Sequence, residues 1–477
     1  MNYLELLPWD IQADIFLRLD PADRASLRQA CRHMRQLMDD PTFWRHQMVR
    51  LSSIRRFREP LWRLIRQRNI RHVEVHPTAK DLSQDAASHR HNLVWNDLQW
   101  DELAENIPLL ETITTPLKCD KNKGLPEGMR SLEHLEVLNV HSILYADDRL
   151  FCDISQLSSL RKLSVEILCV DVIVERTDAL RQLARLPNLE ELSLSFRRYV
   201  LLPMSKLALQ HLLYHLPKLR RFALRKCSFR FPDISGMFIA PPVLEDSPPM
   251  PERDPNVRSN FAQLTVEEGA SGESEKPERI SRLNLEELDL SGTLHHVLNE
   301  EAIAALQSLQ IFRLQTHGID ELLESFLTSC LTKWANLREL DLRNATAPAE
   351  VFQHVPLSLR IIHLNLTEIE FGLSIEALLK LSERCGTTLT DLHLYGCTNL
   401  NKIGNLPDWF PNLHRLSLHG DLELITRDIL CRLSEMEFLQ ELDVRECKVQ
   451  PGKDVWQILA SLMGPKTRIV IESEPQT

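Results

Sequence analysis

A short leucine pattern returns along most of the chain: Leu, two residues, an aliphatic residue, one residue, and a second aliphatic residue. It occurs eleven times, starting at Leu135, Leu160, Leu189, Leu219, Leu285, Leu309, Leu337, Leu359, Leu389, Leu413 and Leu439. Neighbouring starts are 22–30 residues apart, except for one interval of 66 residues. A period of this length indicates a solenoid, in which each repeat packs only on its neighbours.

The motif also predicts what each repeat contains. Its last two aliphatic residues are separated by one residue, so they point to the same side of a short strand. Between motifs, residues 375–385 and 426–436 carry apolar side chains three and four apart, which favours helices. The spacing matches leucine-rich repeats, which are roughly 20–29 residues long. We therefore predict an α/β solenoid over residues 109–477, with parallel strands inside and helices outside.

The long interval holds an insertion between two repeats. Residues 238–278 are rich in Pro, Glu and Ser, with too few apolar side chains to form a core. We expect a disordered loop there. Ser247 and Ser274 lie near acids and are candidates for phosphorylation, although a tolerated surface insertion explains the segment more simply.

The first 50 residues do not follow the repeat. One helical stripe consists of apolar residues four apart: Leu7, Ile11, Ile15 and Leu19. Asp20 and Asp40 each precede a proline, which is the pattern of an N-cap followed by proline in the first turn. We predict a three-helix unit over residues 1–50, and a helical linker with an irregular first repeat over 51–108. A core this small is marginal alone, so such a unit usually docks on something larger.

The order of residues in this unit resembles the F-box motif. The matching positions are Leu7-Pro8, Ile15-Phe16, Leu19, Asp23, Leu27, Cys31-Arg32, Leu37, Asp40-Pro41 and Trp44. The chain departs from the motif at Trp9, Ala30 and Met34.

An F-box followed by leucine-rich repeats is similar to the family of substrate receptors of SCF-type cullin–RING ubiquitin ligases. The resemblance implies that the F-box docks on a Skp-type adaptor, which bridges to the cullin–RING ligase, while the repeats hold a protein substrate. The residues that it assigns to adaptor binding are Leu7, Pro8, Ile11, Ile15, Phe16, Leu19 and Leu27.

Charge is unevenly distributed along the chain. Residues 1–72 hold 14 Arg, no Lys and 8 acids, a net of 14 − 8 = +6, while the whole chain carries −11. The arginines alternate with apolar residues, so we interpret them as the charged faces of amphipathic helices rather than as a nucleic-acid-binding arm. We expect neither a nucleic acid nor a membrane as a partner, since no apolar run is long enough to span a bilayer.

The sequence offers little that indicates catalysis. It contains no P-loop, dinucleotide-binding, zinc-protease, hydrolase or kinase motif set, and His211 and His215 lack a third metal ligand nearby. We therefore expect a non-catalytic protein without a cofactor or a metal. The ten cysteines show no C-x-x-C pair, and no secretory signal is evident, so reduced thiols in the cytoplasm or nucleus are expected. A ligase-independent binding scaffold remains the alternative function.

The residue between the two aliphatic positions of each motif, and the residue just after them, should face the concave side of the arc. The early strands offer small or neutral residues there, whereas the last five offer Arg, Asp, His and Tyr, and Arg and Tyr are enriched at binding hot spots. We assign substrate binding to Arg343, His393, Tyr395, His419 and Arg445.

Overall fold

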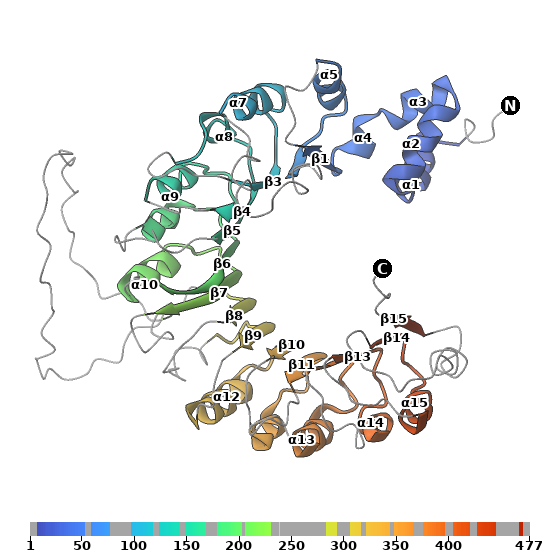
Figure 1. Cartoon of the computed structure of the whole chain (residues 1–477), viewed down its shortest axis with the longest axis vertical. Coiled ribbons are helices and arrows are strands. Elements are labelled where there is room, and N and C mark those ends of the chain that lie inside the picture. The colour runs from blue at the N-terminus through green and yellow to red at the C-terminus, as the bar shows by residue number, and fades with distance from the viewer. Residues whose placement is uncertain are drawn as a thin grey trace, which may run out of the picture.

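The parallel strands of this chain form one curved sheet. The computed structural model describes residues 7–52, 59–76, 97–117, 124–143, 148–167, 179–202, 206–229, 238, 283–292, 306–315, 321–343, 348–365, 375–395, 404–419, 427–444 and 467–470. Within these residues, fifteen strands pair in chain order, each with the next. The sheet bends into an open arc with the strands along its inner side and the helices outside (Figure 1). The predicted α/β solenoid is confirmed.

Eleven of the strands coincide with the eleven leucine motifs. The strands are β1 (Met48–Ser52), β2 (His72–His76), β3 (Thr112–Pro116), β4 (Val137–Ile143), β5 (Lys162–Ile167), β6 (Glu191–Leu202), β7 (Arg221–Phe229), β8 (Glu287–Ser291), β9 (Ile311–Gln315), β10 (Glu339–Leu342), β11 (Ile361–Asn365), β12 (Asp391–Tyr395), β13 (Arg415–His419), β14 (Glu441–Asp443) and β15 (Arg468–Val470). The motifs supply β4 to β14. The sheet therefore begins well before the first motif, because β1 to β3 pair in the same order without a complete leucine pattern.

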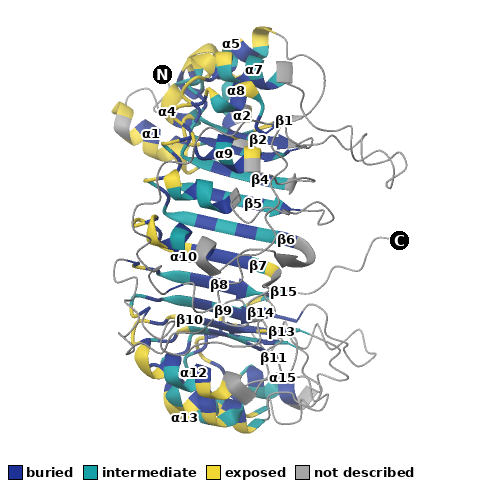
Figure 2. Cartoon of the chain, turned by 90° about the vertical axis from the view of Figure 1, so that its left-hand side faces the viewer, coloured by how far each residue is buried: buried dark blue, intermediate teal, exposed yellow. Residues whose placement is uncertain are grey.

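The helical layer lies outside the arc. It comprises α5 (Glu59–Gln67), α7 (Asp97–Asn106), α8 (Glu127–Arg130), α9 (Asp148–Ile154), η3 (Ala179–Arg185), α10 (Lys206–Tyr214), α12 (Glu321–Lys333), η5 (Ala349–His354), α13 (Ile375–Cys385), α14 (Leu406–Trp409) and α15 (Arg427–Leu433). Exposed residues gather on this layer, while the strands are mostly buried or half-buried (Figure 2). The helix over 375–385 has the predicted bounds, and the helix expected over 426–436 is shorter, at Arg427–Leu433.

The leucines hold the repeats together by forming one continuous core. The first leucine of every motif is at most 3% exposed. Along β5, Leu163, Val165 and Ile167 point into this core, while the residues between them face the inside of the arc. Burying one such side chain stabilises the fold by roughly 1.5–3 kcal/mol. The strand β15 pairs with β14 and so covers the edge of the last repeat.

The N-terminal unit is made of α1 (Trp9–Leu17), α2 (Pro21–Ala30), α3 (Arg32–Met38) and α4 (Pro41–Trp44). Both predicted caps form: the carboxylates of Asp20 and Asp40 accept hydrogen bonds from the backbone N–H groups of Asp23 (2.8 Å) and Thr42 (2.9 Å). The second expected helix is divided in two at Cys31. This residue adopts an extended conformation, and its sulfur caps α3, which the helical spacing of the apolar residues does not reveal.

A salt-bridged junction joins this unit to the arc. Asp39, at the end of α3, accepts hydrogen bonds from Arg28 of α2 and from Arg68, which follows α5. The Arg68 guanidinium lies 3.7 Å from the centre of the Trp44 ring, and Trp44 packs against the cores of both units. Burial alone would raise the pKa of Asp39, but the hydrogen bonds and charges of Arg28 and Arg68 lower it below its usual value. These arginines are therefore engaged within the protein.

The insertion expected over residues 238–278 lies outside the described residues, apart from Phe238. The Phe238 side chain is 4% exposed and belongs to the core of the arc.

Candidate functional surfaces: an exposed helix face and the concave sheet

One face of α1 exposes apolar side chains that nothing in the described residues covers. Ile11 is 46% exposed and Ile15 is 38% exposed, one helical turn apart, and Pro8 lies exposed one turn earlier. The opposite face of the same helix places Ala13 and Phe16 in the core of the unit. Exposing large aliphatic side chains in a row is unfavourable in water, so this face is suited to a protein partner.

The residues assigned to adaptor binding divide into a surface group and a supporting group. Pro8, Ile11 and Ile15 lie at the surface, and Leu7 is half-buried. Phe16 is 2% exposed and packs edge-on against Phe43, with ring centres 6.1 Å apart. Two further leucines pack against this small core: Leu19 and Leu27. Any contribution of Phe16 to docking is therefore indirect, through the position of α1.

Two exposed residues of α1 were not assigned from the sequence. Trp9 is 45% exposed, and its ring contacts that of Phe43 at 5.8 Å. Leu17 is 46% exposed. Arg24 fixes the end of this helix by donating hydrogen bonds to the carbonyl oxygens of Leu17 (3.1 Å) and Phe43 (3.0 Å). Trp9 is also one of the positions at which the chain departs from the F-box pattern.

The concave side of the sheet is a second candidate surface, built from residues in register. The pairing aligns one central row across β4 to β13: Asn139, Ser164, Ser193, Ala223, Asp289, Arg313, Asp341, His363, His393 and Ser417. Because parallel strands lie about 4.8 Å apart, neighbours in this row contact one another directly.

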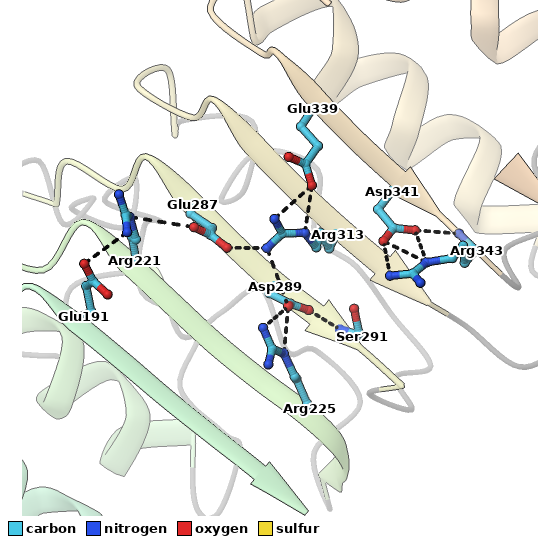
Figure 3. Close-up of polar contacts among 10 residues, drawn as sticks. All are labelled: Glu191, Arg221, Arg225, Glu287, Asp289, Ser291, Arg313, Glu339, Asp341 and Arg343. Carbon is cyan, nitrogen blue, oxygen red and sulfur yellow. Dashed lines mark hydrogen bonds and ion pairs between the residues drawn. The ribbon is translucent and has the colours of Figure 1, made fainter. Parts of the chain in front are cut away.

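From β6 to β10 the concave side carries a ladder of ion pairs, which we call the charge ladder (Figure 3). Arg221 lies between Glu191 (3.1 Å) and Glu287 (3.7 Å). Arg313 continues the ladder by pairing with Glu287 and with Glu339 (2.8 Å). Burial alone would lower the pKa of Arg313, but Glu339 and Glu287 raise it, so the guanidinium stays charged.

Two buried aspartates anchor the charge ladder. Asp289, at 2% exposure, accepts hydrogen bonds from Arg225 (2.7 Å) and from the backbone N–H of Ser291 (2.9 Å). Asp341, at 3% exposure, receives the side chain and the backbone N–H of Arg343, and this hydrogen bonding raises the pKa of Arg343. The buried carboxylates are thus fully engaged by arginines of their own and neighbouring strands.

From β11 to β13 the concave side changes to stacked rings, which we call the ring ladder. The rings of His363 and His393 stack at 4.2 Å with an interplanar angle of 10°. Those of Tyr395 and His419 stack at 4.7 Å with an angle of 9°. The Arg343 guanidinium lies 5.3 Å from the centre of the Tyr395 ring, which is within the range of a cation–π interaction.

Two histidines of the ring ladder, His363 and His393, have lowered pKa values. Burial, reinforced by His393, lowers the pKa of His363 to about 4, and Asp341 offsets this only in part. Burial also lowers the pKa of His393, with His419 and Arg343 acting in the same direction against Asp391. The stacked pair of His363 and His393 is therefore neutral near neutral pH.

Four of the five residues assigned to substrate binding come together here: Arg343, His393, Tyr395 and His419. Arg445 lies outside the described residues. His363 was not assigned, yet it is the ring that joins His393 to Tyr395 (6.4 Å).

Sequence reasoning also missed the charged row of Glu191, Arg221, Glu287 and Glu339. Each stands at the third position of its motif, two residues before the concave position that was considered. Side chains two residues apart on a strand point to the same face, so the third motif position could have been assigned to the concave face from the sequence.

Comparison with known protein families gives a match at the N-terminal end of the chain. The F-box domain family matches residues 4–46. No curated protein matches the chain significantly by sequence.

Solved structures that resemble the chain include an internalin from Listeria monocytogenes (14% identity, TM-score 0.37, covering 76% of this chain and 86% of that one). Rad7 in its complex with Elc1 from yeast has 14% identity and a TM-score of 0.41, and covers 87% of both chains. TLR13 in complex with ssRNA13 has 15% identity and a TM-score of 0.31, and covers 90% of this chain and 65% of that one. These TM-scores are below 0.5, so the assignment of the repeat rests on the leucine motif and the sheet.

The chain is therefore an F-box/leucine-rich-repeat protein: an F-box domain followed by a solenoid of leucine-rich repeats. The F-box domain supports a general role as an adaptor-binding subunit of the SCF type. In the part of the chain that the structure describes, no helix has the length and hydrophobicity needed to cross a membrane.

Proposed function

We propose that this protein is the substrate-recognition subunit of an SCF-type E3 ubiquitin ligase. In this role the F-box docks on a Skp-type adaptor, and through it on a cullin–RING ligase, while the repeats bind a protein substrate. The observation that carries the proposal is the exposed apolar face of α1 in the segment that matches the F-box family. Such a subunit performs no chemistry; it raises the effective concentration of substrate lysines near a ubiquitin-charged enzyme.

The arrangement of the two parts supports this role. The F-box lies at one tip of the arc, beside its open side (Figure 1). The junction of Asp39, Arg68 and Trp44 ties it to the first repeats. A rigid connection is useful here, because the distance between a bound substrate and the ligase then depends on the fold and not on a loose linker. We place this activity in the cytoplasm or the nucleus.

We propose the ring ladder, together with Arg343 and Arg445, as the principal substrate surface. Rings and arginines are the side chains most enriched at hot spots, and neutral rings are easier to desolvate than the paired charges of β6 to β10. Replacing Tyr395 by Ala should remove the stack with His419 and weaken substrate binding by a factor of about thirty, as expected for a hot spot worth about 2 kcal/mol.

The adaptor claim is tested by co-purification. Replacing both Pro8 and Ile15 by Ala removes exposed apolar surface from α1 without touching Phe16, and should abolish co-purification with the adaptor. A matched control replaces two exposed leucines of the helical layer, Leu357 (55% exposed) and Leu379 (40% exposed), by Ala. The control should bind the adaptor normally.

Undiminished adaptor binding by the Pro8 and Ile15 variant would favour the alternative function, a ligase-independent scaffold that uses the same repeats. Thermal unfolding of each variant shows whether the arc stays folded.

A further inference from the structure

A hollow opens in the concave face over β4 to β7, away from the ring ladder. Its volume is about 360 Å³. The floor consists of Ser164, Ser193 and Ala223, which lie in register on three adjacent strands. The same central row continues with larger side chains: Asp289, Arg313, Asp341, His363 and His393. The hollow therefore exists because three consecutive repeats carry small residues at one position.

The rim of the hollow presents positive charge outward. Lys162, Arg221 and Arg225 line it with side chains that are 44%, 52% and 43% exposed. The two lining carboxylates, Glu191 and Glu287, are only 28% and 19% exposed. A molecule entering the arc consequently meets ammonium and guanidinium groups before it meets carboxylates.

Hydrogen-bond donors are also in excess. Glu191 forms ion pairs with two cations, Lys162 at 2.7 Å and Arg221 at 3.1 Å, and each cation has further N–H groups that can donate hydrogen bonds. Each lining cation is already paired, Lys162 and Arg221 with Glu191 and Arg225 with the buried Asp289, so the charges around the hollow balance. Among the described residues, the hydroxyl groups of Ser164 and Ser193 have no hydrogen-bond partner. The hollow therefore offers an excess of hydrogen-bond donors, and the most exposed of them are positively charged.

We propose that this hollow is a binding site for a carboxylate side chain, Asp or Glu, of a protein that binds inside the arc. An ionised carboxylate has only acceptor oxygens, so it can accept hydrogen bonds from arginine and hydroxyl groups together, and the exposed cations of the rim favour its negative charge. A phosphate dianion would need a cluster of arginines that are not already shared with carboxylates. The site lies on other strands than the ring ladder, and it rests on the proposed function, because it names a side chain by which a protein bound to the repeats would be recognised.

The test begins with selection of short random peptides, displayed on phage, on the immobilised full chain. We expect the selected peptides to share an Asp or Glu at a fixed position. Changing that residue to Asn or Gln in a synthetic peptide should weaken binding at least about tenfold, the effect of losing a charged hydrogen bond.

Two variants locate the site, each with a neighbour as its control. Ser193→Leu fills the hollow, while Ser195→Leu adds the same volume two residues along the same face of β6, outside the lining. Arg221→Met removes a rim charge, while Arg220→Met removes the adjacent arginine, which pairs with Glu286 and does not line the hollow. Ser193→Leu and Arg221→Met should each weaken peptide binding at least about tenfold, and both controls should leave it unchanged.

Selected peptides without a shared acid, a selection that yields no binder, or binding that survives both Ser193→Leu and Arg221→Met would each overturn the proposal. Since Arg221→Met adds no volume, it keeps the test decisive if Ser193→Leu does not fold. Adaptor binding is measured separately through α1, so failure of this site and failure of the ligase role are distinguishable.

Discussion

The charge ladder of β6 to β10 and the ring ladder of β11 to β13 stand on the same backbone. In both, one aliphatic pair per strand faces the core, and the residues between face the inside of the arc. In the charge ladder the charged side chains pair with one another, as Arg313 does with Glu287 and Glu339. The ring ladder leaves neutral ring edges of His363 and Tyr395 half-exposed. The repeat therefore fixes where side chains stand and leaves their chemistry free to differ.

This difference predicts opposite sensitivities. Removing one partner of an ion pair in the charge ladder destabilises the fold, because the other partner is left partly buried without a counter-charge. Protonating the stacked imidazoles destabilises the fold, because each protonated ring then carries a charge that is shielded from water. The two ladders should therefore differ in how much folding stability is lost and in whether a substitution or a drop in pH causes the loss.

The largest effect is expected from Arg313→Met in the charge ladder. Arg313 is 21% exposed and pairs with three carboxylates: Glu287, Asp289 and Glu339. Removing it should lower the free energy of unfolding by about 2–4 kcal/mol, somewhat less than the roughly 3–5 kcal/mol for a fully buried pair, because Arg313 is partly exposed. Arg415→Met is the matched control: this arginine is 62% exposed and has one ion pair, with Asp391 at 3.5 Å, so its loss should be below about 1 kcal/mol. If denaturant unfolding showed the same loss of stability in Arg313→Met and Arg415→Met, the ion pairs of Arg313 would not stabilise the fold as proposed.

A smaller effect is expected from acid acting on the ring ladder. The pKa of His363 is lowered to about 4 in the folded chain, below the unfolded value of about 6.5. The unfolded chain therefore binds more protons between these values, and stability falls as the pH drops from about 6.5 toward 4. We expect about 1–2 kcal/mol to be lost by pH 5, and His363→Phe, which keeps a ring without a titrating nitrogen, to remove this part. An unchanged pH profile in His363→Phe would show that other groups cause the acid sensitivity.

The smallest effect is expected from the ring contacts themselves. A double-mutant cycle of Tyr395→Leu and His419→Leu should give a coupling of about 0.5–1.5 kcal/mol, typical of stacked rings. A cycle of Tyr395→Leu with His215→Leu, on the helical layer, should give a coupling near zero. If both cycles gave the same coupling, the ring ladder would not be a stabilising unit.

The repeats could be predicted from the sequence because one leucine per repeat carries the core. Leu135 and its ten counterparts stand in constant phase, and each is buried as the period requires. The strands β1 to β3 were not predicted because none of them carries the full motif. In β2, Ile70 stands in the leucine position before Val73. In β3, Leu110 and Ile113 have the right spacing, but Thr115 occupies the second aliphatic position. The break at Cys31 escaped because a thiol is an unusual helix cap.

The functional surfaces were only partly predictable. Exposure of Ile11 and Ile15 depends on which side of α1 meets Phe43, and a helical stripe alone does not say whether it faces the core or a partner. The sequence singled out three of the four rings, His393, Tyr395 and His419, but their stacking depends on the register of β11, β12 and β13, which sequence spacing does not fix. The hollow over β4 to β7 could not be predicted, because the sequence shows only small or neutral residues on the early strands. It does not show that charged side chains surround them in the folded chain.

Hydrogen–deuterium exchange of the full chain, with and without the Skp-type adaptor, tests the central claim most directly. The account predicts that the adaptor protects backbone amides of the F-box helices, above all around Ile11 and Ile15 of α1, and leaves the strands β4 to β13 unchanged. Protection along the concave strands without protection of α1 would contradict it, because the adaptor would then occupy the surface that we assign to the substrate.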